Sequence, residues 1–415
     1  MVERGEVVAV TRRAADRVRA GHLWVYRSDV VGGGAGLAPG GLVTVVDGRG
    51  IPVGSAIYSS ASEIALRMVS KAAGLDRATY LSDVKARLGQ ALELRKTVAA
   101  EAFSHSGQDD ACRLVFSEAD GLPGIVADRY GELVVVQLLT QGTAQQDVRR
   151  ALAETLADQP WAGTVVERPD PRVRELEKLE VPPDGALFAR TAFEDTQLRT
   201  VFTINGVKFN FDAGAGQKTG AFLDQRLNYA AAARWARGRS LDVCTYQGGF
   251  ALHLARSCDH VTGVDASRAA LEVAERNYQT NAEAGAFANA KVDWLEADAF
   301  ELLREWESSG ERFDTIVLDP PAFAKNKRAA EGAMRGYKEL NLRAIKMLRP
   351  GGTLVTCSCS HHVGMEEFAG VVRDASTDAG RQVQLLEMRG AAPDHPAVFT
   401  LPETSYLKCL VCRVG

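Results

Sequence analysis

The chain has 415 residues, 46% of them hydrophobic and 25% charged, and a net charge of −4. A chain of this length holds two or three domains with sizeable cores, and its composition excludes a disordered protein. The longest apolar runs fall far short of the roughly 18 residues that a membrane-spanning helix needs, and the first residues, MVERGEVVAVTRRAADR, lack the apolar segment of a signal peptide. Seven cysteines are too few for a disulfide scaffold. We therefore expect a cytoplasmic protein with reduced thiols and no membrane partner.

Residues 1–72 are predicted to form a small β-barrel. The apolar segments EVVAV, LVTVV, PVGSAIYS and EIALRMV are separated by glycine-rich stretches typical of hairpins and loops. The segment from residue 12 to residue 27 adds arginines, among them Arg12 and Arg13, close to Trp24. Arginines beside exposed aromatic rings suit phosphate contacts and base stacking, which makes this segment a candidate RNA-binding surface. The alternative is a capping helix with Trp24 in the core.

Residues 73–200 are predicted to form a small α+β domain. The apolar spacing over 74–104 indicates a long connecting helix. Strand-like segments then flank a DGLPG turn, and a helix is expected near 144–158.

Residues 201–415 alternate strand-like and helical segments, which is typical of a parallel sheet covered by helices on both faces. Strands are expected at 240–244, 260–265, 291–298, 313–321 and 352–358, and helices at 248–256, 267–282, 299–307, 331–348 and 365–379. The two final strands, VQLLEM and SYLKCLVCRV, lack a helix of comparable length between them. This indicates an antiparallel hairpin at the sheet edge.

Acidic residues end the first three predicted strands of this last domain: Asp242, Asp265 and Asp298. Ligands bind at the carboxyl ends of the strands in such sheets, and Asp265, followed by Ser267 at a predicted helix N-cap, suits the hydroxyls of a ribose. Gly248 and Gly249 begin the helix after the first strand and let a ligand approach the backbone; a tight turn is the alternative interpretation. Because no lysine or arginine joins these acids, S-adenosylmethionine (SAM), which has no phosphates, is favoured over a dinucleotide.

The fourth strand ends in LDPPAF (318–323), where two prolines hold Asp319 and the neighbouring carbonyls in a fixed posture toward a planar substrate. DPPAF differs by one inserted residue from the [DN]PP[FYW] pattern of methyltransferases that act on exocyclic amino groups. The next segment is basic, since residues 321–350 contain eight lysines and arginines, including Lys325 and Lys327, and two glutamates. It is a second candidate RNA-binding surface or, alternatively, a solvated helix face.

The fifth strand runs into TCSCSHH (356–362), and its thiols allow three interpretations. Cys357, Cys359 and a histidine suit zinc, but no second well-spaced pair of ligands is evident, and no metal is expected. A pair of inert cysteines is the second interpretation. In the third, a cysteine beside Asp319 is a nucleophile, with His361 or His362 favouring the thiolate.

A thiolate and a carboxyl group near the methyl group of SAM match the methylation of cytosine. Cytosine C5 is a poor nucleophile, but addition of a thiolate at C6, with an acid group engaging N3, turns C5 into an enamine-like carbon. Methyl transfer to C5 follows, and loss of the C5 proton then expels the cysteine. Strands four and five supply such a pair.

Several stretches along the chain are specific as a set: GHLWVY, RLVFSEADGLPGIVADRYG, GQKTGAFLDQR, DVCTYQGGF, LDPPAF, TCSCS and the AAPDHP…YLKCLVCRV end. With them the chain resembles the large-subunit ribosomal RNA methyltransferase I family, SAM-dependent RNA (cytosine-5) methyltransferases. The resemblance implies a PUA barrel, a central EEHEE-type domain and a class I Rossmann-like methyltransferase domain with a mostly parallel seven-stranded sheet and a C-terminal antiparallel hairpin. It further implies 23S ribosomal RNA as partner and, since dimers occur in the family, a homodimer.

The resemblance also implies roles for individual residues. Those expected to hold the methionine part of SAM are Lys218, Thr219, Phe222, Asp224, Arg226, Tyr246, Gly248 and Gly249. Asp265 would hold the ribose and Asp298 the adenine, with Asp319 near the transferred methyl group. Cys359 matches the catalytic cysteine of the family's SCS motif. The family departs from other RNA cytosine-5 enzymes in having DPPAF where they have PCS, which leaves one catalytic strand that bears a cysteine.

Three functions remain open at this point. The first is formation of 5-methylcytosine in 23S ribosomal RNA, with Cys359 and Asp319 as catalytic residues. The second is methylation of guanine N7 or N2, or of an exocyclic amine, in which Asp319 and the two prolines position the base and the cysteine is idle. The third is an RNA-binding protein whose methyltransferase fold no longer turns over.

Overall fold

A computed structural model describes residues 6–33, 36–104, 109–182, 184–214, 221–287, 290–323 and 330–415 of the chain. The chain folds into two compact units. The first comprises Met1–Phe202, Phe211–Gly220 and Pro393–Thr404, and the second comprises Thr203–Asn210, Ala221–Ala392 and Ser405–Gly415. Among the described residues, no helix combines the length and the apolar character that crossing a lipid bilayer requires.

The first unit begins with a six-stranded sheet in the order β2-β6-β5-β4-β1-β3. Its strands are β1 (Val7–Val10), β2 (Trp24–Tyr26), β3 (Val30–Gly32), β4 (Leu42–Val46), β5 (Pro52–Tyr58) and β6 (Ile64–Ser70). The predicted strand segments are therefore confirmed. Helix α1 (Arg12–Arg19) begins at Thr11, whose side chain accepts a hydrogen bond from the Ala14 amide, and it buries Ala14 and Ala15 against a core that includes Val8 and Leu66.

A five-stranded sheet follows in the order β11-β10-β9-β8-β7. Its strands are β7 (Ala111–Phe116), β8 (Ile125–Tyr130), β9 (Leu133–Leu138), β10 (Thr164–Glu167) and β11 (Ala186–Ala189), and its helices are α2 (Arg77–Val98), α3 (Gln146–Ala157) and α4 (Pro171–Glu177). The long connecting helix and the helix near 144–158 are confirmed as α2 and α3. The core between α2, α3 and the sheet is apolar and includes Leu88, Leu92 and Val136.

Strands β12 (Arg199–Ile204) and β13 (Val207–Asp212) form a two-stranded sheet that was not predicted. Strand β12 runs across the predicted domain boundary between residues 200 and 201. The boundaries at 72/73 and 200/201 stay predictions, because the compact units divide the chain differently.

The second unit is built on a seven-stranded sheet in the order β16-β15-β14-β17-β18-β20-β19. Its strands are β14 (Arg239–Val243), β15 (His260–Asp265), β16 (Lys291–Glu296), β17 (Phe313–Leu318), β18 (Leu348–Ser358), β19 (Val383–Arg389) and β20 (Lys408–Val414). Neighbours from β16 to β18 are parallel, and β20 is antiparallel to both β18 and β19. The predicted sheet and its C-terminal hairpin are confirmed, with β19 at the edge.

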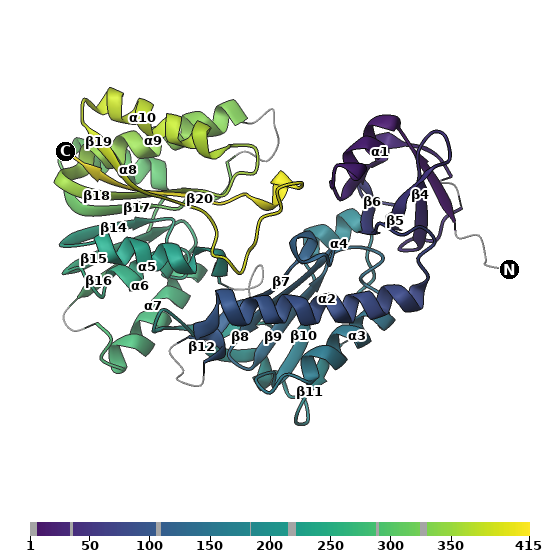
Figure 1. Ribbon diagram of the computed structural model, residues 1–415. Helices are drawn as coiled ribbons and strands as arrows, with labels where there is room; N and C mark the ends of the chain where they lie inside the picture. The colour runs from purple at the N-terminus through teal and green to yellow at the C-terminus, as the bar shows by residue number, and fades with distance from the viewer. Residues whose placement is uncertain are drawn as a thin grey trace. The chain divides into compact units, whose positions relative to one another are not determined.

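Helices cover both faces of this sheet (Figure 1). The helices are α5 (Arg226–Trp235), α6 (Gly249–Leu254), α7 (Arg268–Glu283), α8 (Ala299–Ser308), α9 (Ala330–Met347) and α10 (Met365–Ala379). Figure 1 shows α9 and α10 on one face and α5, α6 and α7 on the other. Buried runs such as the TIVL of β17 suit a strand that is covered on both sides; α5 was not predicted.

The strand register decides which residues meet at the carboxyl edge of the sheet. Val243 pairs with Leu318, which in turn pairs with Thr356. The segments that follow β14, β17 and β18 therefore leave the sheet side by side. Because ligand sites lie at this edge in parallel sheets, these segments form the frame of the candidate site.

Candidate active site

Asp242 lies beneath the turn that follows β14. It is fully buried, and its Oδ2 accepts hydrogen bonds from the Thr245 hydroxyl at 2.5 Å and the Ala251 amide at 2.8 Å. Among the described residues, no donor contacts its Oδ1. Burial raises the pKa of Asp242 to about 7. The carboxyl group thus holds the turn and the start of α6 in place.

The turn itself has an uncommon backbone. Cys244 and Tyr246 have φ angles of 63° and 53°, and Gly248 has φ of 87°, a region that costs energy for residues with a side chain. A Cβ on Gly249 would lie 2.6 Å from the Tyr229 hydroxyl. The glycines were expected to leave room for a ligand; at Gly249 that space is filled by Tyr229, so this glycine permits close packing of α5 on the turn.

Asp265 ends β15 and is oriented by two backbone amides. Its Oδ2 accepts from Tyr246 N at 2.8 Å and its Oδ1 accepts from Ser267 N at 2.9 Å. The Ser267 hydroxyl accepts from Ala270 N and so caps α7. The half-exposed carboxylate keeps further lone pairs for hydroxyl donors.

Asp298 occupies the equivalent place after β16. Its Oδ1 accepts from Phe300 N at 2.9 Å and Glu301 N at 3.0 Å, which makes it the N-cap of α8. The side chain is exposed. Asp298 therefore has a structural role at the helix start, and it also lies where the edge of the sheet is open.

The segment before α5 approaches the same turn. The ring of Phe222 lies 5.1 Å from that of Tyr246, tilted by 60°. Asp224 Oδ2 accepts a hydrogen bond of 2.5 Å from the Tyr406 hydroxyl, while Arg226 is buried at the first position of α5. Lys218 and Thr219 lie outside the described residues.

These groups fit a SAM molecule by their chemistry. An oriented carboxylate on Asp265 suits ribose hydroxyls, and the facing rings of Phe222 and Tyr246 offer an aromatic surface next to it. Four carboxyl groups act together on Cys244 in the β14 turn, those of Asp242, Asp265, Asp298 and Asp319, and such a cluster of acids suits a cationic sulfonium better than a phosphate.

Asp319 follows β17 and is held by the neighbouring strand and by α5. Its amide donates to the Val243 carbonyl at 3.2 Å, and its Oδ2 accepts from Gln225 Nε2 at 3.0 Å. Burial raises the pKa of Asp319 to about 8, and the negative charges of Asp224 and Asp242 add to the shift. At neutral pH this carboxyl group therefore carries a proton.

Cys359 is the first residue after β18. The serines on both sides of it, Ser358 and Ser360, are fully buried, whereas Cys359 is partly exposed. Cys357 is also fully buried, opposite Cys409 on β20, and burial raises the pKa of its thiol well above the ordinary value. The two thiols therefore differ in exposure: Cys357 is buried, and Cys359, which the resemblance singled out, is partly exposed.

The structure also describes the surroundings of this segment, while the choice between an inert and a nucleophilic Cys359 stays a prediction. Among the described residues, no three His, Cys, Asp or Glu side chains come together in a way that could hold a metal ion. The ring of His361 lies 5.3 Å from that of Tyr406, and His362 is exposed. None of the seven cysteines, all of which lie within the described residues, forms a disulfide bond.

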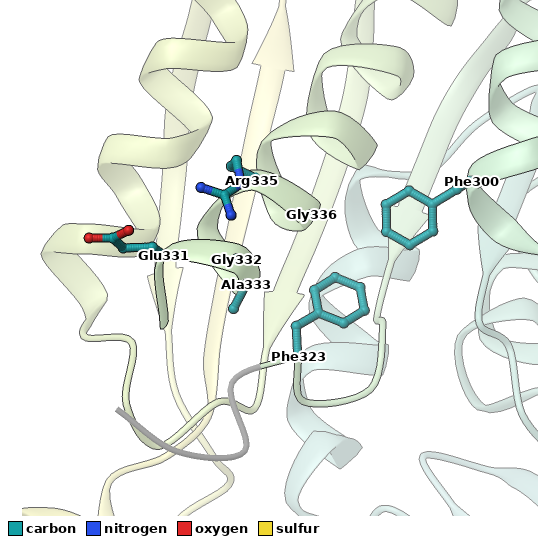
Figure 2. Close-up of a pocket in the computed structure, with 7 residues that line it drawn as sticks. All are labelled: Phe300, Phe323, Glu331, Gly332, Ala333, Arg335 and Gly336. Carbon is teal, nitrogen blue, oxygen red and sulfur yellow. The ribbon is translucent and has the colours of Figure 1, made fainter. Parts of the chain in front are cut away.

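The phenylalanine of DPPAF turns toward the helices of the sheet. Phe323 lies 5.8 Å from the ring of Phe300 on α8 and 4.8 Å from that of Tyr337 on α9. Its ring packs on Gly336, where a Cβ would be 3.2 Å away. Figure 2 shows Phe300 and Phe323 side by side in a shallow pocket whose remaining lining comes from the first turns of α9.

The predicted RNA-binding residues separate into three groups. Arg12 and Arg13 are exposed and line a hollow on α1. Trp24 is half-buried, donates its indole N–H to Glu118 at 2.8 Å and lies under the Arg67 guanidinium, so it serves packing within the first unit and is not an exposed stacking platform. Lys325 and Lys327 lie outside the described residues.

The basic run after β17 is largely neutralised by acids from elsewhere in the sequence. The described ion pairs are Lys338 with Asp378, Arg343 with Glu307 and Glu339, Lys346 with Glu307, and Arg349 with Asp314. This part of the run is paired as on a solvated helix face, and its role in RNA binding stays a prediction.

Four residues of the site were not predicted: Gln225, Tyr337, Tyr406 and Lys408. Gln225 lies within GQKTGAFLDQR and Tyr406 and Lys408 within the final YLKCLVCRV stretch, so the motifs marked the segments. The pairs that these residues form with Asp319, Ser360 and Asp224 join distant parts of the chain, and no local pattern predicts them.

Comparisons with known proteins agree with this geometry. Residues 8–71 match a PUA-like domain, and residues 122–413 match the S-adenosylmethionine-dependent methyltransferase family. The chain is 37% identical over 395 residues to ribosomal RNA large subunit methyltransferase I of Erwinia tasmaniensis and 37% identical over 399 residues to that of Pseudoalteromonas translucida. Each of these alignments covers 95% of both chains.

Solved structures share the fold at low sequence identity. A SAM-dependent methyltransferase structure from Streptococcus mutans has a TM-score of 0.77 at 16% identity. The methyltransferase SMU.776, solved with S-adenosylhomocysteine, has a TM-score of 0.79 at 17% identity. Each covers 98% of this chain, which itself spans 99% of each of them. The predicted fold class and SAM-dependent methyltransferase family are confirmed.

Proposed function

Because the chain belongs to the ribosomal RNA large subunit methyltransferase I family of S-adenosylmethionine-dependent enzymes, we propose that it methylates cytosine C5 in 23S ribosomal RNA. In this proposal Cys359 is the nucleophile and Asp319 is the acid that engages the base. The printed names of the relatives support the ribosomal RNA substrate. The choice of cytosine C5 rests on the site.

One observation carries this choice: a reachable thiol and a protonated carboxyl group follow neighbouring strands. Asp319 leaves β17 and Cys359 leaves β18, and these strands pair up to Leu318 and Thr356. Because its pKa is raised to about 8, the Asp319 carboxyl group is protonated at neutral pH and can donate that proton to N3 of the base. A cytosine held between these two strand ends would meet both groups.

The chemistry then proceeds on the base. The Cys359 thiolate forms a bond to C6, and the electron pair of the C5–C6 double bond makes C5 nucleophilic while Asp319 donates its proton to N3. SAM, when bound, supplies an electrophilic methyl group. Water takes up the C5 proton, which restores the double bond and expels the thiolate, and the N3 proton returns to Asp319.

The remaining residues are proposed to hold SAM. Asp265, oriented by two amides, would take the ribose hydroxyls, and Asp298 the adenine amino group. The other residues proposed to line the SAM site, mostly at its methionine end, are Lys218, Thr219, Phe222, Asp224, Arg226, Asp242, Tyr246, Gly248, Gly249 and Ser267. Of these, Asp242, Gly249 and Ser267 would act through the backbone that they shape.

The alternative reaction on an exocyclic amine finds less support. An enzyme of that kind needs an aromatic ring after its Asp-Pro-Pro motif to stack on the target base. Here Phe323 packs on Phe300, Tyr337 and Gly336. The third interpretation, an idle RNA-binding fold, leaves the raised pKa of Asp319 without a use.

The proposal is tested by nucleoside mass spectrometry of 23S ribosomal RNA from a strain that lacks the endogenous modification. The RNA is incubated with SAM and wild-type protein, Cys359→Ala or Cys357→Ala. We expect new 5-methylcytidine with the wild type and Cys357→Ala and none with Cys359→Ala. Full activity of Cys359→Ala, or a methylguanosine or methyladenosine product, would overturn the proposal.

A further inference from the structure

The lysine at the start of β20 is buried next to the SCS motif. Lys408 is 4% exposed, and its Cα pairs with that of Ser358 across the antiparallel ladder. Its Nζ donates hydrogen bonds of 2.6 Å to the Ser360 and Tyr406 carbonyls. Lysine is almost never buried without a compensating reason.

The same turn is held from a second side by α9. The Tyr337 hydroxyl and the Ser360 hydroxyl are 2.9 Å apart, and both residues are buried. Ser358 and Ser360 therefore point into the protein, where Tyr337 and Lys408 hold the turn. Cys359, between them, keeps partial exposure. The two contacts decide which way the thiol faces.

Lys408 also couples electrostatically to this thiol. Burial lowers the pKa of Lys408 to about 8, while negative charge on Cys359 and on Glu367 acts to raise it. Such coupling is reciprocal, so the ammonium group that gains from a thiolate also lowers the pKa of that thiol. At pH 7 most of the Lys408 population still carries its charge.

The other groups around this pair come from three elements. Glu367 on α10 accepts from the Gly364 amide, and its charge opposes a thiolate. Tyr337 on α9 is neutral at pH 7, because burial raises its pKa. His361, in the turn itself, lies with its ring 5.3 Å from that of Tyr406. Lys408 is thus the cation whose ammonium group is bonded directly to the turn.

We propose that Lys408 is a positioning residue for methyl transfer, which fixes the SCS turn and stabilises the thiolate of Cys359. The inference rests on the proposed function, in which Cys359 attacks the base. The inference adds what stabilises the thiolate form of the nucleophile. The positive charge is that of Lys408, on the antiparallel hairpin at the end of the sheet, and neither His361 nor His362 is needed to supply it.

The rate of alkylation by iodoacetamide measures the reactivity of the Cys359 thiol in the absence of RNA and SAM. The rate of carbamidomethylation at Cys359, located by peptide fragmentation, is followed from pH 5.5 to 10 in wild type, Lys408→Met, Tyr337→Phe and Lys338→Met. Lys408→Met keeps the length of the side chain and removes its charge. Tyr337→Phe removes a contact to the turn and keeps the charge, and Lys338→Met removes a lysine from the outer face of α9.

We expect the midpoint of the wild-type profile to lie below that of Cys359 in the urea-unfolded chain. It should rise by at least one pH unit in Lys408→Met, so that alkylation at pH 7 slows about tenfold, and move little in the two controls. A wild-type midpoint at or above the unfolded value would overturn the inference even if Lys408→Met failed to fold. An unchanged midpoint in folded Lys408→Met would also overturn it.

The result separates this inference from the proposed function. If Cys359→Ala kept full methylation activity, the nucleophile would be wrong whatever the alkylation profile showed. If Cys359→Ala were inactive and Lys408→Met left the thiol unchanged, the reaction would stand and the role of Lys408 would fall.

Discussion

At Asp319, a role in the proposed reaction and the stability of the fold make opposite demands on one carboxyl group. Gln225 holds this carboxyl group and the β14 backbone holds the Asp319 amide, and burial raises the pKa of the carboxyl group to about 8. In the proposed reaction the proton on this group is used at neutral pH. Loss of that proton at higher pH leaves an ionised carboxylate, which lowers the stability of the fold. Residues of this kind mark functional sites, where activity is favoured over stability.

The pH dependence of methyl transfer should reflect this group. We expect the rate to rise with pH as the thiolate of Cys359 forms and to fall above about pH 8 as Asp319 loses its proton, which gives a bell-shaped profile. Asp319→Asn should lower kcat about 100-fold or more and remove the alkaline limb. Single-turnover rates between pH 5.5 and 9.5 measure this, and a rate of wild type that keeps rising to pH 9.5 would contradict it.

Asp319→Asn should also change stability in a predictable direction. Because the folded pKa is raised, the contribution of Asp319 is fully present below the unfolded pKa near 4 and is lost as pH rises through about 8. The asparagine variant should therefore exceed wild type by more than about 1 kcal/mol in free energy of unfolding at pH 9. Urea denaturation at pH 5 and pH 9 compares the two proteins; an equal stability difference at both pH values would contradict the assignment.

At the scale of secondary-structure elements, the hairpin of β12 and β13 supports a helix that borders the candidate site. The hairpin of β12 and β13 is fastened to α7 through side chains that replace a neighbouring strand. Asn281 Oδ1 accepts from Lys208 N at 2.8 Å and its Nδ2 donates to Lys208 O at 2.7 Å, while Asn277 Oδ1 accepts from Asn210 N at 2.7 Å. Helix α7, whose first turn carries Ser267, is thereby tied to the hairpin.

Asn281→Ala tests this fastening. The variant leaves the Lys208 amide and carbonyl without their partner at a site that is 1% exposed in wild type, and each such group costs about 1–3 kcal/mol. We expect a loss of roughly 2–4 kcal/mol in urea denaturation. Gln279→Ala, on the exposed face of the same helix, serves as the control and should change stability by less than about 0.5 kcal/mol.

Over the whole molecule, a net charge of −4 means that RNA binding must come from local cations. Several of the candidate arginines already have partners: Arg17 is paired with Asp29 and Arg19 with Asp47. On the same helix Arg12 and Arg13 are exposed, and the ion pair of Arg12 with Asp16 is long, at 3.7 Å, and open to solvent. We therefore expect these two to contribute phosphate contacts, whereas Trp24 is engaged with Glu118.

The salt dependence of RNA binding tests this distribution. Arg12→Ala and Arg13→Ala should each weaken binding to unrelated sequences alike and reduce the slope of log K against log salt by about one. Arg19→Ala, which removes a cation already held by Asp47, should leave the slope close to that of wild type. Equal slopes for all variants would place the RNA-binding surface elsewhere.

The sequence by itself determined the alternation of strands and helices in residues 201–415, the hairpin that ends the sheet and the segments around Asp265, Asp319 and Cys359. These follow from periods of two and 3.6 residues and from short motifs, which are local signals. The hairpin of β12 and β13 and helix α5 were missed, because their pattern is weak and their place depends on α7 and the β14 turn.

The tertiary structure alone decided the burial and the partners of the marked residues. Burial separates Cys357 from Cys359, the Trp24 indole is engaged by Glu118, and Arg343 in the basic run is paired with Glu307. The bonds from Gln225 to Asp319 and from Lys408 to Ser360 join residues 94 and 48 positions apart. Such contacts arise when strands and helices pack, since burial and charge depend on neighbours in space that no local pattern of residues encodes.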